Sequence, residues 1–581
     1  MPDWFYRTVA QRVLFCLPGN AGRAVALGVI GTLGKSGTGR AIIDFLGHME
    51  ADPRLAVRVA GTDFPSPIGL GWRVDPERCA TRALERFGVG GIEILADACQ
   101  NVVRGNDRQL YDGTRQAVVM PVPEGIARPL LRRLTGADGR ERLLLPSGEN
   151  LPVLAWDEEP SDAVERGKGV VLQVGTKQSA TGWRVPATMP VELPAQVRAW
   201  RARLAEGAAL VLAGGVANPR DAVTLREAGA NFILVDAGLV FHGPGLVKRC
   251  NEALLSQMAP SHDRKPVDEE TSARRSWFWS CALGTALAAG GALTLGLALT
   301  RVLLPYDEHY LDLTADTLRR NSPRLFAFMA HDRGTLAGTM LGLGALYLML
   351  GWHGIRRSVH GAKTAVLASA LTGFSSFFAF FGFGYFDTLH AFVAAVLMQL
   401  TVQIMVSRPG GAPAQEHVVD DENAIWRYAQ WGQLFWIIHA TGLLIAGSVI
   451  LGIGMTSVFV TEDLDYLCLT GTQAQALGSR MMGVIAHDRA TLGGMLLASG
   501  VAMLLPMLWC YRKGAAWLWL AMIGLGFPAY AAALGVHLWV GYTDWRHIVP
   551  ALLGLSLWFG GVLLSRDYLM GTPRNDPISP P

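Results

Sequence analysis

The segment AHDRGTL at residues 330–336 returns as AHDRATL at residues 486–492, and this repetition decides the fold of the second half of the chain. Asp307 and Tyr310, upstream of the first copy, return at the same offset as Asp463 and Tyr466. Downstream, GYFDTLH at 384–390 returns as GYTDWRH at 541–547. Three matched motifs in one order indicate that this half arose by tandem duplication of one unit.

The duplicated half is also strongly apolar. Hydrophobic residues make up 50% of the 581-residue chain and charged residues only 17%, and the shortage of charge is concentrated after Ser276. Stretches long enough to cross a bilayer lie at 277–300, 335–352, 364–383, 388–406, 433–458, 490–510, 515–539 and 546–564. We therefore predict an all-α transmembrane domain of about eight helices in two tandem four-helix repeats. Because each repeat has an even number of spans, both copies enter the membrane in the same sense.

The distribution of basic residues predicts an orientation. Arg274 and Arg275 precede the first span, and Arg512 and Lys513 lie between the sixth and the seventh. By the positive-inside rule these segments are cytoplasmic, so the N-terminal domain and the C-terminus should lie in the cytoplasm. The first residues lack the uninterrupted apolar core of a secretory signal. We expect an integral protein of the cytoplasmic membrane, in direct contact with the lipid bilayer.

In this topology the repeated polar motifs meet at the extracytoplasmic end of the helices. The candidate site there consists of His331, Asp332, Arg333, Asp387, His390, His487, Asp488, Arg489, Asp544 and His547. Charged groups at membrane depth are costly unless they have partners, so this set is a candidate to bind a metal, a quinone or an anionic headgroup, or to relay protons. The alternative is that these residues are helix caps and interfacial anchors, with Thr335 and Thr491 at helix starts. The sequence leaves open whether they form one site or two.

Two other features of this half have packing explanations. Small residues at Gly338 and Gly342, and at Gly494 and Ala498, are spaced for close contact between helices. His439 lies inside the fifth span, and the sequence has Leu283 at the corresponding position of the first copy. A haem or proton-path role for this histidine is an alternative, but we interpret it as a hydrogen-bonded core residue.

The first half alternates short apolar runs with helical segments, which predicts a parallel α/β barrel of the TIM type. The candidate strands are 66–71, 89–95, 116–122, 151–156, 169–175, 209–214 and 231–236, one short of closure. Seven cysteines without CxxC spacing argue against a zinc ribbon, an iron–sulfur site or a disulfide framework. The net charge of +3, without a basic run, excludes a nucleic-acid partner.

Motifs in this half resemble the class 2, quinone-dependent dihydroorotate dehydrogenases. They are FPSPIGL at 64–70, FGVGGIEI at 87–94, GGV at 214–216 and AGLVF at 237–241. The resemblance implies a membrane-bound flavin oxidoreductase that passes electrons to quinone or to a membrane centre. It further implies that Gly214, Gly215, Ala237 and Gly238 hold the phosphate of FMN, and that the first helices lie on the membrane and admit quinone.

The predicted domains follow from these patterns. They are N-terminal membrane-associated helices at 1–58, a dihydroorotate dehydrogenase-like barrel at 59–254, a polar linker at 255–276, transmembrane repeat 1 at 277–407, a cytoplasmic connector at 408–432, transmembrane repeat 2 at 433–566 and a cytoplasmic tail at 567–581. The sequence does not predict an oligomeric state.

The catalytic motifs of that family are not matched. GWRVDP at 71–76 stands where the family has a lysine against the flavin, and the family's asparagine motifs have no counterpart between Leu110 and Leu210. Dihydroorotate is therefore not the predicted substrate. Lys177 is the one candidate for a substitute cation, and its alternative is a solvated loop lysine. The competing hypothesis is a non-catalytic, degenerate barrel fused to a transporter, sensor or lipid-binding membrane module.

Overall fold

The computed structural model describes most of the chain. The described residues are 3–47, 49–96, 125–135, 138–159, 161–178, 184–186, 189–236, 238–258, 275–379, 385–408 and 422–571. The chain divides into two compact units. The first comprises Met1–Pro260, Glu416–Gln430 and Arg574–Pro581, and the second comprises Ser261–Gln415 and Trp431–Pro573.

The first unit begins with short helices that expose apolar side chains. They are α1 (Asp3–Phe5), the π-helical η1 (Tyr6–Ala10), α2 (Gln11–Phe15), α3 (Gly19–Lys35), α4 (Gly37–Gly47) and the 3₁₀ turn η2 (Pro53–Leu55). Asp3 is buried, pairs with Arg249 and accepts a hydrogen bond of 2.9 Å from the backbone N–H of Gly245. This pairing joins the start of the chain to the last helix of the unit. The exposed apolar side chains are Phe5, Val13, Leu17, Val25, Val29, Ile42 and Phe45.

A closed barrel of eight strands follows, in the order β11-β12-β3-β4-β5-β6-β7-β8. Its strands are β3 (Ile68–Leu70), β4 (Ile92–Leu95), β5 (Leu130–Thr135), β6 (Glu141–Leu144), β7 (Asn150–Ala155), β8 (Gly169–Gln173), β11 (Ala209–Ala213) and β12 (Phe232–Val235). All neighbouring strands are parallel except at β6, which is antiparallel to both β5 and β7. The predicted TIM-like barrel is thus confirmed as a closed barrel, but one section is a β-meander.

The meander explains why the sequence indicated only seven strands. The two tight turns of this section carry Gly139 at φ +75° and Gly148 at φ +90°, so hairpins replace the helices of a regular TIM barrel. β5 (LLRRLT) and β6 (ERLL) mix apolar and charged residues without regular alternation, unlike the fully apolar runs of buried parallel strands. Our prediction of strands therefore missed β5 and β6. The predicted strand at 116–122 lies outside the described residues.

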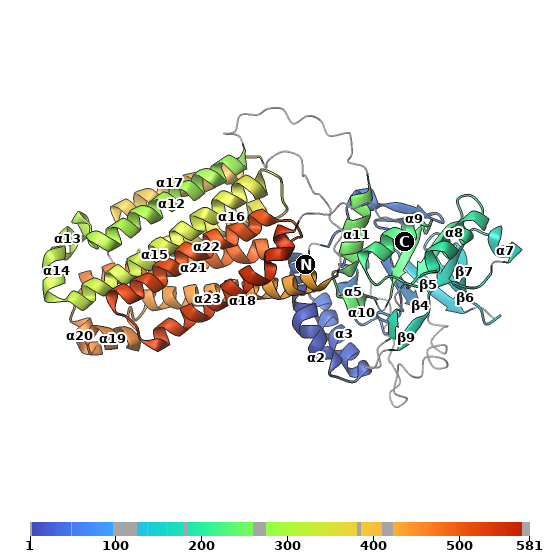
Figure 1. Cartoon of the computed structure of the whole chain (residues 1–581), viewed down its shortest axis with the longest axis horizontal. Helices are drawn as coiled ribbons and strands as arrows, with labels where there is room; N and C mark the ends of the chain where they lie inside the picture. The colour runs from blue at the N-terminus through green and yellow to red at the C-terminus, as the bar shows by residue number, and fades with distance from the viewer. Residues whose placement is uncertain are drawn as a thin grey trace. The chain divides into compact units, whose positions relative to one another are not determined.

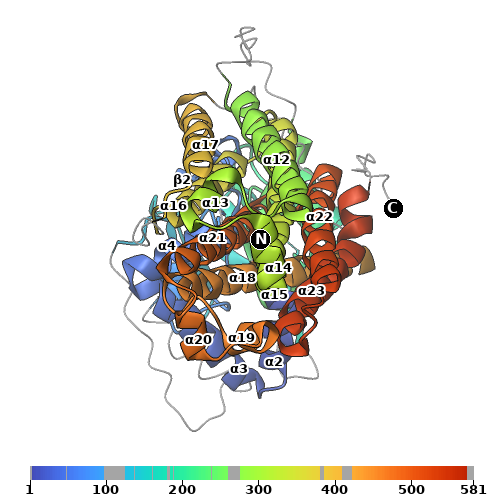
Figure 2. The same ribbon diagram turned by 90° about the vertical axis from the view of Figure 1, so that its left-hand side faces the viewer.

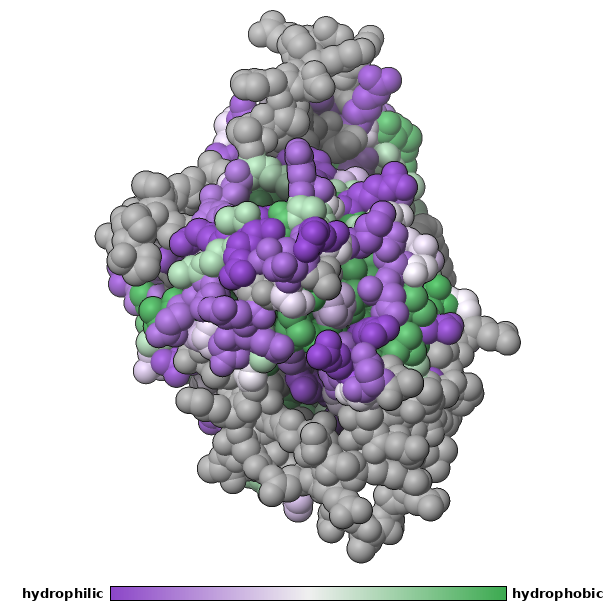
Figure 3. Space-filling view, turned by 90° about the vertical axis from the view of Figure 1, so that its right-hand side faces the viewer, coloured by the Kyte–Doolittle hydropathy of each residue, from purple (hydrophilic) through white to green (hydrophobic). Residues whose placement is uncertain are grey.

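Side chains from both faces of the strands build two cores. Inside the barrel, Leu131, Leu143, Val171 and Val211 pack together with Phe232. Outside, alternate residues of the same strands pack against helices. These helices include α5 (Thr81–Leu84), α7 (Asp162–Glu165), α8 (Leu193–Arg203), α9 (Pro219–Glu227), α10 (Gly238–His242) and α11 (Leu246–Gln257). Two hairpins complete the unit, namely β1 (Val57–Val59) with β2 (Thr62–Phe64), and β9 (Thr176–Gln178) with β10 (Arg184–Pro186). On the face of the molecule that Figure 3 shows, most of the residues coloured by hydropathy are hydrophilic.

The second unit is helical and repeats one order of elements twice (Figure 1). The first copy contains α12 (Ser276–Thr300), α13 (Pro305–Leu311), α14 (Ala315–Asn321), α15 (Pro323–Met349) with the π-helical turn η5 (Leu350–Ile355), α16 (Ala362–Ala379) and α17 (Thr388–Val406). The second contains α18 (Ala424–Met455), α19 (Thr461–Leu467), α20 (Gly471–Gln475), α21 (Ser479–Trp509), α22 (Ala516–Val540) and α23 (Trp545–Met570). The predicted duplication is therefore visible in three dimensions.

Seven helices in the described part of the chain are long and apolar enough to cross a membrane. They are α12, α15 with η5, α17, α18, α21, α22 and α23. α16 stands at the position of the predicted third span and corresponds to α22 of the second copy. The chain thus has the composition of an integral membrane protein, with its apolar helices available for contact with lipid.

Helices of each copy pack against helices of the other copy. α15 of the first copy packs against α22 of the second, and α21 of the second packs against α16 of the first. A side chain at Gly338 or Gly342 would collide with α22, and one at Gly494 would collide with Ser376 of α16. The predicted role of these small residues in close helix packing is confirmed. The short helices α13 and α14, together with α19 and α20, lie at one end of this unit (Figure 2).

The helices that carry the His-Asp-Arg motifs start earlier than predicted. We expected spans from 335 and 490, whereas α15 begins at Pro323 and α21 at Ser479. Thr335 and Thr491 therefore lie inside helices, where each hydroxyl donates to the carbonyl four residues back. Their interpretation as helix starts is wrong, because the charged residues before them are buried in ion pairs and do not interrupt the helix. α18 similarly starts within the predicted connector, and residues 409–421 of that connector lie outside the described part.

Candidate functional site

The polar motifs of the helical unit form two clusters, each built from both copies. The Asp307 cluster consists of Asp307, Arg333, Tyr385, Asp387, His390, His487 and Asp488. The Asp463 cluster consists of Asp463, Arg489, Tyr542, His537, His547, His331 and Asp332. In each, a His-Asp pair from one copy meets residues of the other copy. The residues therefore gather in two clusters at the interface between the copies.

A buried arginine connects the copies in each cluster. In the Asp307 cluster, Arg333 bonds Asp488 at 2.8 Å and Asp307 at 3.0 Å. In the Asp463 cluster, Arg489 bonds Asp463 at 2.8 Å and approaches Asp332 at 3.4 Å. Both arginines also donate to a backbone carbonyl, that of Val302 or Val458. Buried charges of this kind are tolerated because every one of them is paired.

Each arginine holds an aspartate that also organises a short helix. Asp307 accepts a 2.9 Å bond from the backbone N–H of Leu304 before α13, and Asp463 accepts a 2.8 Å bond from Val460 before α19. The same carboxylates accept hydrogen bonds from tyrosine hydroxyls, Tyr385 in the first copy and Tyr542 in the second. Burial raises the pKa of both tyrosines, and the adjacent carboxylate raises it further, so both hydroxyls remain protonated donors.

A histidine pair lies beside each Arg-Asp bridge. In the Asp307 cluster, Nδ1 of His487 lies 3.1 Å from Asp488 and its Nε2 lies 2.9 Å from Nδ1 of His390. In the Asp463 cluster, Nδ1 of His331 lies 2.9 Å from Asp332 and its Nε2 lies 3.0 Å from Nε2 of His537. The two clusters therefore share their ion pairs but differ in how the histidines meet.

The two copies of the GYxDxxH motif contribute different residues to the two clusters. Asp387 caps α17 by accepting a 2.8 Å bond from the N–H of His390, and it lies with His390 and His487 in one group of potential ligands. Asp544 caps α23 in a similar way through Arg546, whereas His537 joins His331 and His547 in the second group. Our sequence analysis missed His537. The signal was weak, because the corresponding position of the first copy is Phe380.

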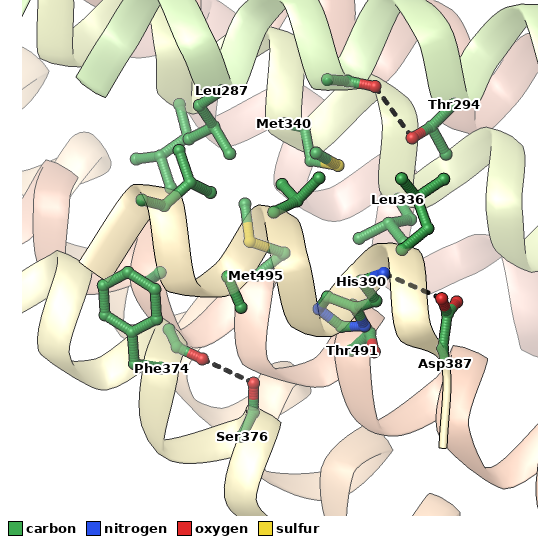
Figure 4. A pocket seen from close by; sticks show the side chains of 18 of the residues that line it. Leu287, Thr294, Leu336, Met340, Phe374, Ser376, Asp387, His390, Thr491 and Met495 are labelled. Carbon is green, nitrogen blue, oxygen red and sulfur yellow. Dashed lines mark hydrogen bonds between the residues drawn. The ribbon is translucent and has the colours of Figure 1, made fainter. Parts of the chain in front are cut away.

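A cavity of about 230 Å³ adjoins the Asp307 cluster. Its walls are mainly apolar side chains of α12, α15, α16, α17 and α21, among them Leu287, Met340 and Met495. Polar groups gather at one end, where His390 and Asp387 lie (Figure 4). The other polar residues that line the cavity include Tyr306, Arg333, His487 and Asp488. A mainly apolar space with polar groups at one end is suited to a lipophilic molecule with a polar head.

His439 does not belong to either cluster. It lies in α18, is 4% exposed, and its Nε2 lies 2.6 Å from the hydroxyl of Tyr530. Because this nitrogen already has a partner, the geometry favours a hydrogen-bonded core histidine over a haem ligand.

In the barrel unit, the described residues that we predicted to hold a phosphate lie after β11 and at the start of α10. Gly214 and Gly215 follow β11 with φ values of +92° and +82°, a conformation that favours glycine. Gly238 begins α10, and Ala237 lies outside the described residues. Lys177 lies in β9, paired with Val185 of β10 in a two-stranded ribbon outside the barrel.

The region where a flavin ring would lie is filled by side chains. Trp72, after β3, packs with Leu95 at the end of β4. Next to them Arg133 is 1% exposed and binds Glu93 and Glu141 at 2.6 Å each and Gln173 at 3.1 Å. These side chains do not fit a flavin ring at this place. Sequence reasoning missed the Arg133 network, because β5 itself was not predicted.

The fold and the site define a class of protein, namely a closed barrel joined to a duplicated set of membrane-type helices. No family model matches the chain. The chain is 24% identical over 294 aligned residues to a dihydroorotate dehydrogenase (quinone) of Sphingopyxis alaskensis, covering 36% of this chain and 83% of that relative. It is 43% identical over 66 residues to dihydroorotate dehydrogenase (quinone) of Stenotrophomonas maltophilia, covering 11% of this chain and 19% of that relative. The chain thus has a distant similarity to these enzymes over part of its length, and it contains a closed eight-stranded barrel.

Proposed function

We propose that the duplicated helical domain binds a membrane quinone in the cavity beside the Asp307 cluster. The single observation that carries this proposal is the cavity itself, with apolar walls and one polar end. A quinone has two carbonyl oxygens that accept hydrogen bonds and an apolar tail that occupies the rest of the space. Tyr306 also lines the cavity, and its hydroxyl can donate such a bond.

The cluster also provides a hydrogen-bonded path away from that end. His390 contacts His487, which contacts Asp488, which is held by Arg333. This chain fixes the orientation of the imidazoles against the quinone head. The distant similarity to enzymes named for quinone supports the same ligand class. We place the protein in the cytoplasmic membrane, with the barrel and the C-terminus in the cytoplasm and the first helices against the membrane surface.

Ligand extraction and binding test the proposal. The full chain, purified in detergent, should release a quinone on solvent extraction, and a short-chain ubiquinone analogue should bind at one site per chain. Ala394 lines the cavity, and Ala394→Phe should weaken this binding at least tenfold by filling the space. Unchanged affinity in this variant, or no quinone bound by the wild type, would contradict the proposal.

A second candidate function is that of an FMN oxidoreductase that transfers electrons to this quinone. The glycine turn at Gly214 and Gly215 and the distant similarity to dihydroorotate dehydrogenase favour it. We rank it second because Trp72 and Arg133 occupy the place where the resemblance would put the flavin ring. A non-catalytic barrel beside a ligand-binding membrane domain agrees better with these two side chains. The visible spectrum of the purified protein decides between them. Flavin bands that disappear in Gly215→Asp, where a carboxylate meets the phosphate, would restore the oxidoreductase; a colourless protein would exclude it.

A further inference from the structure

Two histidines of the Asp463 cluster point ring nitrogens at each other, at a distance of 3.0 Å. Nδ1 of His537 lies 2.6 Å from the carbonyl oxygen of Ala533. A carbonyl only accepts, so this Nδ1 carries the hydrogen, and Nε2 of the neutral ring has a lone pair.

The same reasoning applies to His331. Its Nδ1 lies 2.9 Å from Asp332, whose other oxygen faces the guanidinium of Arg489. This carboxylate is an acceptor, so Nδ1 of His331 donates and Nε2 again has the lone pair. The two lone pairs face each other at 3.0 Å. Two acceptors at this distance repel each other unless a proton or a metal ion lies between them.

A transition-metal ion satisfies both nitrogens. Metal–nitrogen bonds of about 2.0–2.1 Å on one ion place two imidazole nitrogens roughly 3 to 3.5 Å apart. His547 supplies a third nitrogen, because the ligand atoms of all three histidines lie within 4.8 Å of one another. The ring of Tyr542 stacks on that of His547 at 4.3 Å between centroids and holds it in place. Nδ1 of His331 and Nδ1 of His537 bond to a carboxylate and to a backbone carbonyl, which is how proteins orient histidine ligands.

The Asp307 cluster provides an internal comparison. There Nε2 of His487 faces Nδ1 of His390, and a donor on His390 opposite an acceptor on His487 satisfies both rings. No cation is needed to balance that pair. His537 has no histidine counterpart in the first copy, where the sequence has Phe380.

We propose that His331, His537 and His547 bind one divalent transition-metal ion through their ring nitrogens. Three imidazoles select Zn²⁺ or Cu²⁺ over hard cations such as Mg²⁺ or Ca²⁺, and they leave a fourth position for water or another ligand. This site uses different residues from the quinone cavity, so it does not depend on the proposed function.

Metal analysis of the full chain tests this site. The protein is purified in detergent through a tag without histidines, from medium supplemented with zinc and copper, and its metal content is measured by mass spectrometry. We expect one ion per chain. After removal of the ion with a chelator, added Co²⁺ should give the visible absorption of a nitrogen-ligated ion, and added Zn²⁺ should raise the melting temperature by several degrees.

Variants assign the ion to its ligands. His537→Phe, which introduces the residue type of the first copy, and His547→Gln should each lose the ion while quinone binding is unchanged. His390→Gln and His439→Phe are matched controls that should retain it. Elution as a single species shows that each variant is folded, and the effect of Zn²⁺ on the wild type needs no variant. The proposal is overturned if the wild type neither contains nor binds the ion, if His537→Phe retains it, or if His390→Gln loses it instead.

Discussion

The Asp307 and Asp463 clusters descend from one motif and share the same ion pairs, yet their surroundings differ. In both clusters an arginine lies between two aspartates, and a tyrosine hydroxyl donates a hydrogen bond to one of these aspartates. Among the described residues only the Asp463 cluster has a third histidine, and the cavity of about 230 Å³ adjoins the Asp307 cluster. The shared ion pairs stabilise the interface between the copies, and the residues around them decide what each cluster binds.

Removing either arginine should lower the free energy of unfolding more than any other change, and by a similar amount in both clusters. Arg333→Met leaves Asp307 and Asp488 buried without their cation, and Arg489→Met does so for Asp463 and Asp332. Loss of one partner of a buried ion pair costs about 3–5 kcal/mol. Thermal unfolding in detergent should show a large, similar loss for both variants. Arg324→Met, an exposed position on α15, is the control; a small effect of Arg333→Met would show that the shared core is not structural.

Removing either tyrosine hydroxyl should lower the free energy of unfolding by less, and again by a similar amount in both clusters. Tyr385→Phe and Tyr542→Phe each remove one hydrogen bond to a buried carboxylate. Hydrogen bonds to charged groups contribute about 1.5–3 kcal/mol. The decrease in stability should fall in this range for both variants by the same unfolding measurement. A difference larger than this range between the two would mean that the clusters are not structurally equivalent.

A substitution in the cavity should weaken ligand binding, whereas the equivalent substitution in the other copy should not. Ala394→Phe should reduce binding of the quinone analogue at least tenfold, about 1.4 kcal/mol. Ala551 occupies the corresponding position on α23, and Ala551→Phe should leave the affinity within about twofold. Titration of both variants measures this directly. Equal losses would assign the ligand to both clusters.

The tyrosines also predict a modest dependence on alkaline pH. The pKa of Tyr385 and Tyr542 is raised, first by burial and then by the neighbouring aspartate. An unfolded tyrosine loses its proton near pH 10, while the folded one keeps it. The stability is therefore fully present below about pH 10 and decreases as the pH rises above it. Melting curves between pH 8 and about 11 should decline less steeply for Tyr385→Phe than for the wild type; identical slopes would remove this interpretation.

The sequence predicted the duplication and a TIM-like barrel, one strand short of closure, because both leave periodic, apolar or repeated signals. It named His331, His390, His487 and His547 as site residues, but it did not indicate which of them meet. That pairing depends on how helices of the two copies pack against each other, which is a tertiary feature. His537 has no repeated partner, and Arg133 lies in a strand whose charged residues conceal its β periodicity. The proposed roles of Gly214 and Lys177 stay predictions.

The packing of helices of each copy against those of the other has a consequence for how this domain arose. In each cluster a His-Asp pair of one copy completes a site of the other. A single four-helix chain could not complete either site alone, so an unfused ancestor would have required a two-fold homodimer with two identical sites. In such a dimer every substitution appears twice. Fusion into one chain removed that constraint, and it allowed a histidine to be present at residue 537 while phenylalanine remains at residue 380.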